Sequence, residues 1–377
     1  MLHKVAGSLP ALAQWPYLVV TVVTVSYALA AAARLVPMRD KQAPRYRRKL
    51  PAPIWYGGSL VLLIAAAGAI YLLPGTGLRV HTGPARKPAG PESTSAYRLG
   101  VFEPGEFASY RRVSNFAAMV GRRPDIVLSY SNWHTPFQAQ FADTAYRNGA
   151  TLLVQLAPIH VSISSIAAGS YDSKIRRYAD SIRAFGRRVI LSFAPEANGK
   201  WYAWGWTHTS PSTWVAAWRH MVTLFREQHA VNVRWAWTIN ANLPHTGPVR
   251  DWWPGKNYVD LIGIDGYYFR RSSTFNSVFG STIHDVREFT RKPILLSEVG
   301  IGQVAGQAAS MPGLFAGIKR NRLLGLVWFD MAQHSGLYHQ DWRLEGNPAA
   351  IAAFRAGLRS LAAPSAAPGG RSPPRPG

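Results

Sequence analysis

Two glutamates, each at the end of a short apolar run, are the residues best placed to do chemistry in this sequence. The first run is Arg188–Glu196, and the second is Pro293–Gly300, which contains Glu298. Apolar runs of this length are typical of strands that are buried on both faces of a parallel sheet. An acid at the C-terminal end of such a strand faces a site rather than a core. Two such acids can cleave a glycosidic bond, because one protonates the leaving oxygen and the other attacks or activates water.

The elements that must position these acids can be counted. Eight strand-like runs occur between residues 97 and 361, and helix-compatible segments separate most of them, although the link between the fifth and sixth runs has no clear helix. This repeat predicts a closed (β/α)8, or TIM, barrel. An open doubly wound sheet is the alternative, but no glycine-rich phosphate loop follows the first run. The runs are Tyr97–Glu103, Asp125–Ser131, Ala150–Pro158, Arg188–Glu196, Val233–Asn240, Asp260–Tyr268, Pro293–Gly300 and Leu324–Met331.

On this count, Glu196 ends the fourth strand and Glu298 ends the seventh, so the two acids face each other across the barrel mouth. Carboxyl groups roughly 5–5.5 Å apart would indicate a retaining mechanism with a covalent glycosyl-enzyme. Tryptophans at strand ends and in loops, such as Trp204, offer indole faces that pack against sugar rings. His134, at the end of the second strand, is a further candidate for contact with substrate.

Two long uncharged stretches precede the predicted barrel. Residues 5–33 and 51–78 each contain the roughly 20 apolar residues that span a bilayer, and aromatic residues lie near their ends. Residues 34–50 between them carry seven basic residues and one aspartate. The positive-inside rule keeps such a loop in the cytoplasm. We therefore expect a two-helix transmembrane hairpin over residues 1–74 that leaves the barrel outside the cytoplasm. A cleaved signal peptide is the alternative for the first stretch.

The rest of the chain is assigned by composition. Residues 75–96 are rich in proline, glycine, threonine and serine and are typical of a linker, and residues 362–377 are typical of a disordered tail, so the barrel domain covers 97–361. The chain has no cysteine, which excludes disulfides and thiol nucleophiles. No residue cluster has metal-ligand spacing, so we expect neither a metal nor another cofactor. The net charge of +23 favours an anionic lipid or polymer, because no nucleic-acid fold is recognisable.

Four segments together match the pattern of a known family. The first is Phe-Ala-Pro-Glu-Ala-Asn-Gly-Lys-Trp-Tyr-Ala-Trp-Gly, residues 193–205, and the other three are residues 235–240, 253–267 and 292–300. These segments resemble glycoside hydrolase family 26, whose motif His-Glu-Met-Asn-Gly is followed by aromatic residues. The family includes β-mannanases and mixed-linkage β-glucanases within the retaining (β/α)8 glycosidases of clan A. The segment that ends at Tyr267 is the most specific, and the resemblance covers roughly residues 97–361.

The resemblance implies a role for each matching residue. Glu196 would be the acid/base and Glu298 the nucleophile. Tyr267 would hydrogen-bond the nucleophile, and Trp328 on the eighth strand would be the sugar platform. The remaining residues expected to bind substrate are Trp201, which would line a subsite, Trp204, Asn198 and His134.

One position departs from the family pattern. The residue before the acid is Pro195, where the family has a histidine, so a ring without a donor replaces a titratable group. This change affects the tuning of the site and removes neither carboxylate.

We therefore interpret the chain as a multi-pass, membrane-anchored endo-β-glycanase with its catalytic domain outside the cytoplasm. Its expected partners are a polysaccharide substrate, the membrane and the machinery that makes a polysaccharide at the producer's own surface. Two alternatives stay open. One is a transglycosylase that uses the same two glutamates, and the other is an inactive barrel that binds polysaccharide.

Overall fold

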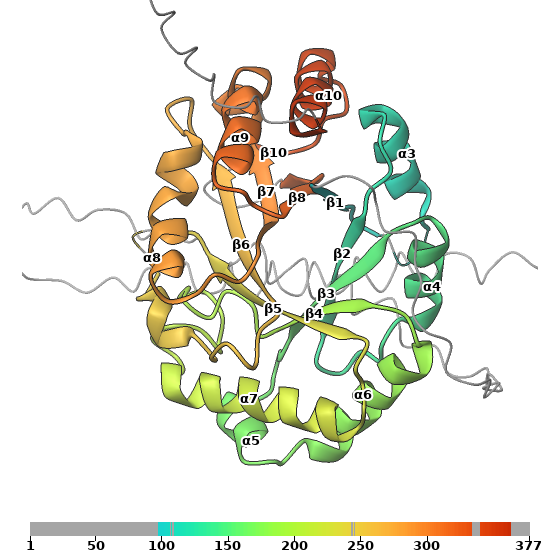
Figure 1. Ribbon diagram of the computed structural model, residues 1–377, viewed down its shortest axis with the longest axis vertical. Coiled ribbons are helices and arrows are strands. Elements are labelled where there is room, and N and C mark those ends of the chain that lie inside the picture. The colour runs from blue at the N-terminus through green and yellow to red at the C-terminus, as the bar shows by residue number, and fades with distance from the viewer. Residues whose placement is uncertain are drawn as a thin grey trace, which may run out of the picture. The chain divides into compact units, whose positions relative to one another are not determined.

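A computed structural model describes residues 97–362, apart from residues 106, 108, 243, 245 and 334–339. The described residues form a closed barrel of eight parallel strands in chain order (Figure 1). Each of the eight predicted runs overlaps one observed strand, with bounds that differ by no more than a few residues, which confirms the predicted barrel. The strands are β1 (Arg98–Phe102), β2 (Ile126–Asn132), β3 (Thr151–Ala157), β4 (Val189–Phe193), β5 (Val233–Asn240), β6 (Leu261–Tyr268), β7 (Ile294–Ile301) and β8 (Gly325–Phe329).

Helices surround the barrel and cover its outer face (Figure 1). Among the described residues of the link between β5 and β6, the helical structure is limited to the short 3₁₀ turn η2 (Val249–Trp252), as the sequence indicated. The helices are α3 (Arg111–Val120), α4 (Ala139–Arg147), α5 (Ile163–Ala167), α6 (Asp172–Phe185), α7 (Pro211–Glu227), α8 (Ser281–Phe289), α9 (Gln307–Arg320) and α10 (Pro348–Ala362), with short turns η3 (Asn276–Gly280) and η4 (Gln303–Ala305) and a small hairpin, β9 (Ala332–Gln333) and β10 (Gln340–Asp341).

The alternation of side chains along each strand divides the core into two parts. One set packs outward against the helices, and the other fills the barrel interior with residues such as Leu128, Leu153, Ile190 and Leu295. Successive side chains of a strand point to opposite faces, so a residue's parity fixes the part of the core that it joins.

A β-bulge in β7 breaks this alternation where the candidate nucleophile lies. Leu295 faces the interior, whereas Leu296 and Val299 both pack outward. The register with β8 shifts between Leu296 and Val299, so β7 holds one extra residue there. Both Ser297 and Glu298 can therefore point into the barrel. Regular alternation from Leu295 would turn Glu298 toward the helices, and the bulge re-aims it into the site.

Gly263 on β6 makes room for a polar layer beneath the carboxylates. A Cβ atom at this position would lie 2.5 Å from Ser297 Oγ and 2.7 Å from Thr238 Oγ1. Ser192 Oγ also donates to Thr238 Oγ1 at 2.8 Å. The absence of a side chain at Gly263 thus lets hydroxyl groups of β4, β5 and β7 meet below the site.

We expect Gly263→Ala to lower the free energy of unfolding by roughly 1–3 kcal/mol, because the added methyl overpacks the polar layer. Urea denaturation measures the change. Gly313→Ala is the matched control, since it lies on an exposed turn of α9 with no atom within 4 Å of the added methyl. The free energy of unfolding of that variant should rise by roughly 0.5–1 kcal/mol. Equal effects of the two substitutions would contradict the packing account.

The expected transmembrane hairpin lies outside the described residues. Within residues 97–362, none of the helices has both the length and the apolar character needed to cross a bilayer.

Candidate active site

Three polar side chains form a row at the carboxyl ends of β5, β6 and β7. In the strand register Asn240 pairs with Asp265, and Asp265 pairs with Glu298. Residues at one level of a parallel barrel project to the same side, so the three side chains lie next to one another. Glu196 follows β4 and joins this row, because Asn240 Nδ2 donates to its Oε1 at 2.6 Å.

Two phenol groups hold the carboxylate of Glu298. Tyr130 Oη on β2 donates to Glu298 Oε1. Tyr267 Oη on β6 donates to Glu298 Oε2 at 2.5 Å, which is the hydrogen bond that the resemblance implied. Burial and the charge of Glu298 raise the pKa of both tyrosines, so both remain protonated donors. The donors fix the carboxylate in position and stabilise its ionised form.

Glu196 sits in a strained turn after β4. Its φ is 54° and that of Ala194 is 44°, although neither residue is glycine. The turn is held by hydrogen bonds from Ala194 N to Leu156 O and from Glu196 N to Thr238 O, each of 2.9 Å. Such backbone strain persists only where surrounding contacts enforce it, and it is common at active sites.

Aromatic residues of the following loop support the turn. Trp201 is half-buried, and its Nε1 donates to Glu196 Oε2 at 2.9 Å. Trp204 is buried, stacks on Tyr202 with ring centroids 4.3 Å apart, and donates to Pro195 O at 2.8 Å. The position of Trp204 therefore corrects its expected role in binding substrate, because the indole holds the loop and offers no open face to a sugar.

The acids of the row compete for protons. Burial raises the pKa of Glu196, and the hydrogen bonds from Asn240 and Trp201 oppose that rise. Burial and the charge of Glu196 raise the pKa of Glu298 to about 8, although its phenol donors act in the opposite direction. Burial and the charges of Glu298 and Glu196 raise the pKa of Asp265 as well. Like charges so close together cannot all ionise, so the cluster retains a proton near neutral pH.

Asp265 is completely buried and lies beside Glu298 in the row. Ser297 Oγ donates to its Oδ1 at 2.5 Å, and Gln155 Nε2 donates to its Oδ2 at 3.4 Å. Asp265 therefore anchors the β6–β7 side of the row and acts on its neighbours through charge.

Two expected substrate contacts do not fit the structure. Trp328 is fully buried, and its ring packs edge-on against Phe354 of α10 at 5.3 Å, so it lies on the outer face of β8 and cannot serve as a sugar platform. Asn198 is also fully buried, and it exchanges two 2.9 Å hydrogen bonds with the backbone of Asn240. This pairing positions Asn240 for its bond to Glu196. His134 is exposed in the turn after β2, where contact with substrate stays a prediction.

Tyr130 and Asn240 are site residues that the sequence reasoning missed. Both lie within predicted strands, and each binds one of the two glutamates. Their parity along the strands was the available signal, because Tyr130 is two residues beyond the interior Leu128. Using that signal required knowing which face of each strand is interior.

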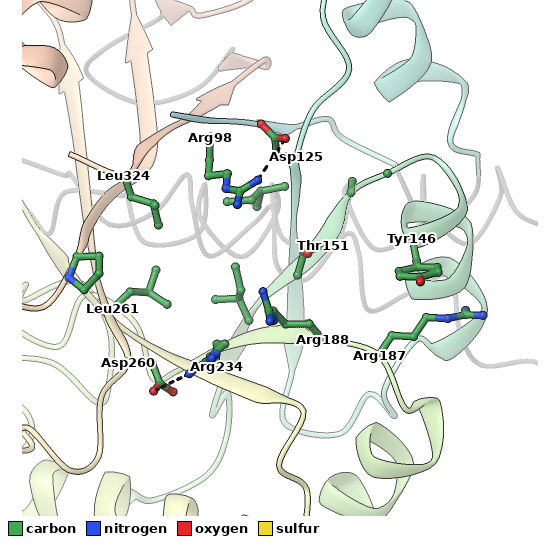
Figure 2. A pocket seen from close by; sticks show the side chains of 15 residues that line it. Arg98, Asp125, Tyr146, Thr151, Arg187, Arg188, Arg234, Asp260, Leu261 and Leu324 are labelled. Atoms are coloured by element: carbon green, nitrogen blue, oxygen red, sulfur yellow. Dashed lines mark hydrogen bonds and ion pairs between the residues drawn. The ribbon is translucent and has the colours of Figure 1, made fainter. Parts of the chain in front are cut away.

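A cavity of about 380 Å³ opens at the opposite, N-terminal end of the barrel (Figure 2). Arginines line it, and two of them face aspartates, with Arg98 3.8 Å from Asp125 and Arg234 3.5 Å from Asp260. The two aspartates also accept backbone N–H groups of the neighbouring strands. Paired charges at this end of a barrel support stability, so the cavity is not the candidate active site.

We expect Tyr267→Phe to lower kcat/KM by roughly 10–100-fold, because a hydrogen bond to a charged group contributes about 1.5–3 kcal/mol. The lost donor raises the pKa of Glu298, and the nucleophile must be ionised. The acidic limb of the pH profile should therefore move up by about 1–2 pH units. Tyr268→Phe is the matched control, because its buried hydroxyl has no partner among the described residues. An unshifted profile for Tyr267→Phe would contradict the assignment.

A parallel eight-stranded barrel with acids at the carboxyl ends of β4 and β7 has the architecture of the (β/α)8 glycoside hydrolases. The comparison with known families agrees, because the model of glycosyl hydrolase family 26 matches residues 160–351, half of the chain. The chain belongs to glycosyl hydrolase family 26.

Individual relatives show the same likeness. Endoglucanase H of Acetivibrio thermocellus is 31% identical over 278 residues, which cover 69% of this chain and 30% of that protein. The chain thus spans less than a third of the length of that curated relative. The mannan endo-1,4-beta-mannosidase of Bacillus subtilis is 24% identical over 205 residues, 48% of this chain and 52% of that protein.

Solved structures share the fold. A modular endo-beta-1,4-mannanase from Cellulomonas fimi has a TM-score of 0.54 at 16% identity and covers 70% of this chain and 71% of its own. The structure of GH26C from Muricauda sp. has a TM-score of 0.53 at 15% identity, with 70% and 86% covered.

Proposed function

We propose that this chain is a retaining endo-β-glycanase that uses Glu298 as nucleophile and Glu196 as acid/base. The observation that carries the proposal is the different environment of the two carboxyls in one buried row. Glu298 is held by two phenol donors, whereas Glu196 is held by an indole and an amide. Membership of family 26 supports the same pair of roles.

In the first step, Glu298 attacks the anomeric carbon while the glycosidic oxygen takes a proton from Glu196. The bond to the leaving sugar breaks, and an ester forms between the remaining sugar and Glu298. The raised pKa of Glu196 suits a general acid, because the carboxyl must carry its proton near neutrality.

In the second step, Glu196 takes a proton from water, and the water oxygen attacks the anomeric carbon. Glu298 leaves as a carboxylate, and both phenol donors stabilise its returning charge. The hydrogen bonds from Trp201 and Asn240 stabilise the ionised Glu196 that must act as base. Two inversions give a product with the configuration of the substrate.

A β-mannan or a β-glucan is the proposed class of substrate. The two named curated relatives support it, since one is an endoglucanase and the other is a mannan endo-1,4-beta-mannosidase. Purified full-length protein should release oligosaccharides from at least one of mannan, mixed-linkage glucan, xylan and the producer's own exopolysaccharide. Binding without release on all of them would favour the inactive barrel, and products longer than the substrate would indicate transglycosylation.

We also propose that the domain is held outside the cytoplasm by a hairpin over residues 1–74. The two uncharged stretches and the basic loop of residues 34–50 support this arrangement. A tether favours work on a polysaccharide that the producer makes at its own surface. A reporter fused after residue 90 should be active outside the cell, and one fused near Arg45 should be active inside. An outside signal at Arg45 would contradict the topology.

A further inference from the structure

A second group of acids lies at the seam where β1 meets β8 and the barrel closes. Glu103 follows β1 and Asp330 follows β8, and the two strand ends are joined by a hydrogen bond from Asp330 N to Phe102 O at 3.0 Å. Glu345, in the segment before α10, adds a third carboxyl. One oxygen from each of the three carboxyls lies within 4.8 Å of the other two. None of these acids belongs to the row that contains Glu298.

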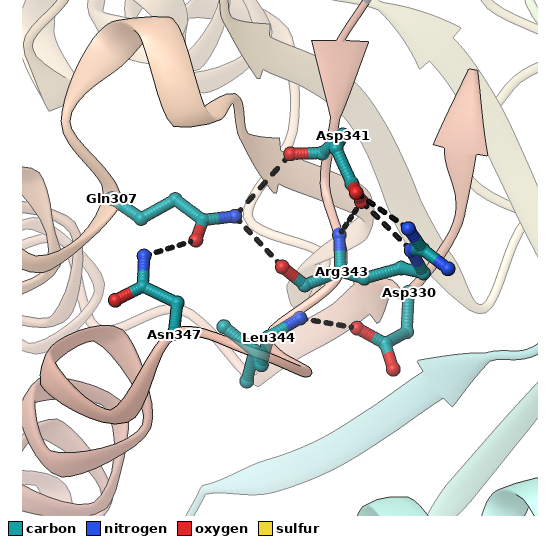
Figure 3. Close-up of polar contacts among 6 residues, drawn as sticks. All are labelled: Gln307, Asp330, Asp341, Arg343, Leu344 and Asn347. Atoms are coloured by element: carbon teal, nitrogen blue, oxygen red, sulfur yellow. Dashed lines mark hydrogen bonds and ion pairs between the residues drawn. The ribbon is translucent and has the colours of Figure 1, made fainter. Parts of the chain in front are cut away.

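Two oxygens of this group are buried without a hydrogen-bond partner. Glu103 is 2% exposed and Asp330 is 1% exposed. Asp330 Oδ1 accepts from Leu344 N at 3.0 Å and from Trp328 Nε1 at 3.2 Å. Figure 3 shows the hydrogen bond from Leu344 N to Asp330. Asp330 Oδ2 and Glu103 Oε1 have no hydrogen-bond partner among the described residues. Buried acceptors in a folded protein normally have a donor, a water or an ion, so these two oxygens need a shared proton, a water or an ion as a partner.

We propose that Glu103, Asp330 and Glu345 bind one Ca²⁺ ion at the barrel seam. Carboxylate oxygens are the hard ligands that Ca²⁺ prefers, and Ca–O bonds of about 2.3–2.6 Å suit oxygens that lie up to 4.8 Å apart. Glu345 is exposed, so the ion can enter from solvent on that side and keep waters as further ligands. The positive charge of the ion would compensate two carboxylates that are otherwise buried together.

A shared proton is the competing explanation. Burial and the charge of Asp330 raise the pKa of Glu103 to about 9, and burial and the charge of Glu345 raise that of Asp330 to about 7. Without a cation, one proton between the two carboxyls would neutralise part of the charge near pH 7. The two explanations differ in a measurable way, because only the ion site responds to added Ca²⁺.

The seam also supports the nucleophile through a chain of aromatic contacts. Phe102 and Phe329 stack with centroids 4.9 Å apart. Phe102 packs edge-on against Tyr130 at 4.9 Å, and Phe329 packs edge-on against Tyr267 at 5.5 Å. These are the two tyrosines that donate to Glu298. An ion that fixes the ends of β1 and β8 would therefore also fix the packing behind the nucleophile.

The test uses the full-length protein after treatment with a chelator. Saturating Ca²⁺ should raise the melting temperature by roughly 5 °C, because a ligand that binds only the folded state stabilises it. Tb³⁺, used as a luminescent substitute for Ca²⁺, should show emission when tryptophan is excited, since Trp328 lies next to Asp330. Added Ca²⁺ should displace Tb³⁺ and quench that emission. Neither readout depends on turnover, so the result is independent of the proposed enzymatic function.

Variants locate the ion. Asp330→Asn keeps an acceptor oxygen for Leu344, and Glu103→Gln keeps the side-chain volume, so both variants should fold. Ca²⁺ should no longer raise the melting temperature of either variant. Glu345→Gln should weaken Ca²⁺ binding by about 10-fold or more. Asp180→Asn, at a half-buried position on α6 outside the seam, is the control and should keep the wild-type response to Ca²⁺.

Three outcomes would overturn the proposal. The first is no response of wild type to Ca²⁺ or Tb³⁺ while Asp330→Asn melts at or above the wild-type temperature, which is the result that a shared proton predicts. The second is an equal Ca²⁺ shift in wild type and in both seam variants, which would place the ion elsewhere. The third is an equal shift with Mg²⁺ at the same concentration, which would contradict the assignment to Ca²⁺.

Discussion

Glu298→Ala should lower kcat/KM by at least about 10⁴-fold on every substrate, including activated aryl glycosides. Glu298 is the carboxylate that forms the ester, so without it no covalent intermediate forms even when the leaving group departs easily. The alanine side chain also leaves the hydroxyls of Tyr130 and Tyr267 without their acceptor. Initial rates on the polysaccharide and on an aryl glycoside measure the loss.

Two controls separate a lost nucleophile from a damaged fold. Glu288→Ala changes an exposed glutamate near the end of α8 and should keep wild-type activity. The melting temperature of Glu298→Ala should show whether the barrel persists. A folded Glu298→Ala protein that retains more than a few per cent of wild-type turnover would contradict the assignment of Glu298.

The effect of Glu196→Ala on turnover should depend on the leaving group of the substrate. Turnover of the polysaccharide should fall by about 10²–10⁴-fold, because the departing sugar oxygen needs a proton. An aryl glycoside with a good leaving group needs none, so the first step should proceed and the ester on Glu298 should accumulate. Added azide can enter the space that the carboxyl leaves and attack the ester. The expected product is a glycosyl azide with the configuration of the substrate.

Trp201→Phe is the matched comparison for this prediction. It removes the indole N–H that donates to Glu196 and leaves the carboxyl in place, so azide should give no rescue. If Glu196→Ala lowers turnover equally on both kinds of substrate and gives no azide product, the acid/base role is contradicted. Identical absence of turnover in wild type and all variants, with equal binding of one polysaccharide, would support the inactive-barrel alternative.

The barrel could be predicted from the sequence because each of its strands is an apolar run of ordinary length. The lack of a clear helix between β5 and β6 was visible in the sequence too. The structure has one short turn there, η2. The bulge in β7 was not visible, because an extra residue in Leu-Leu-Ser-Glu-Val changes no composition or period that a short run can reveal. Without the bulge, strand parity alone would have turned Glu298 away from the site.

The two glutamates could be predicted because an acid at the end of a buried strand is conspicuous. The side chains that hold them could not, since Tyr130 and Asn240 come into contact with Glu298 and Glu196 only when the barrel closes in register. The sugar-platform role of Trp328 was implied by the family resemblance. Strand alternation instead places its ring against α10.

Trapping of the covalent intermediate tests the central claim most directly. The fluorine of a 2-deoxy-2-fluoro glycoside slows both steps, and a good leaving group still allows the first step to occur. The fluorosugar then stays attached to the nucleophile. A panel with manno, gluco and xylo configurations, followed by intact mass and peptide mapping, covers the proposed substrate classes. We expect one fluorosugar per chain, attached to Glu298, and no attachment in Glu298→Ala. Attachment to Glu196, or hydrolysis of an unfluorinated substrate with inverted configuration and no labelling, would contradict the double-displacement mechanism.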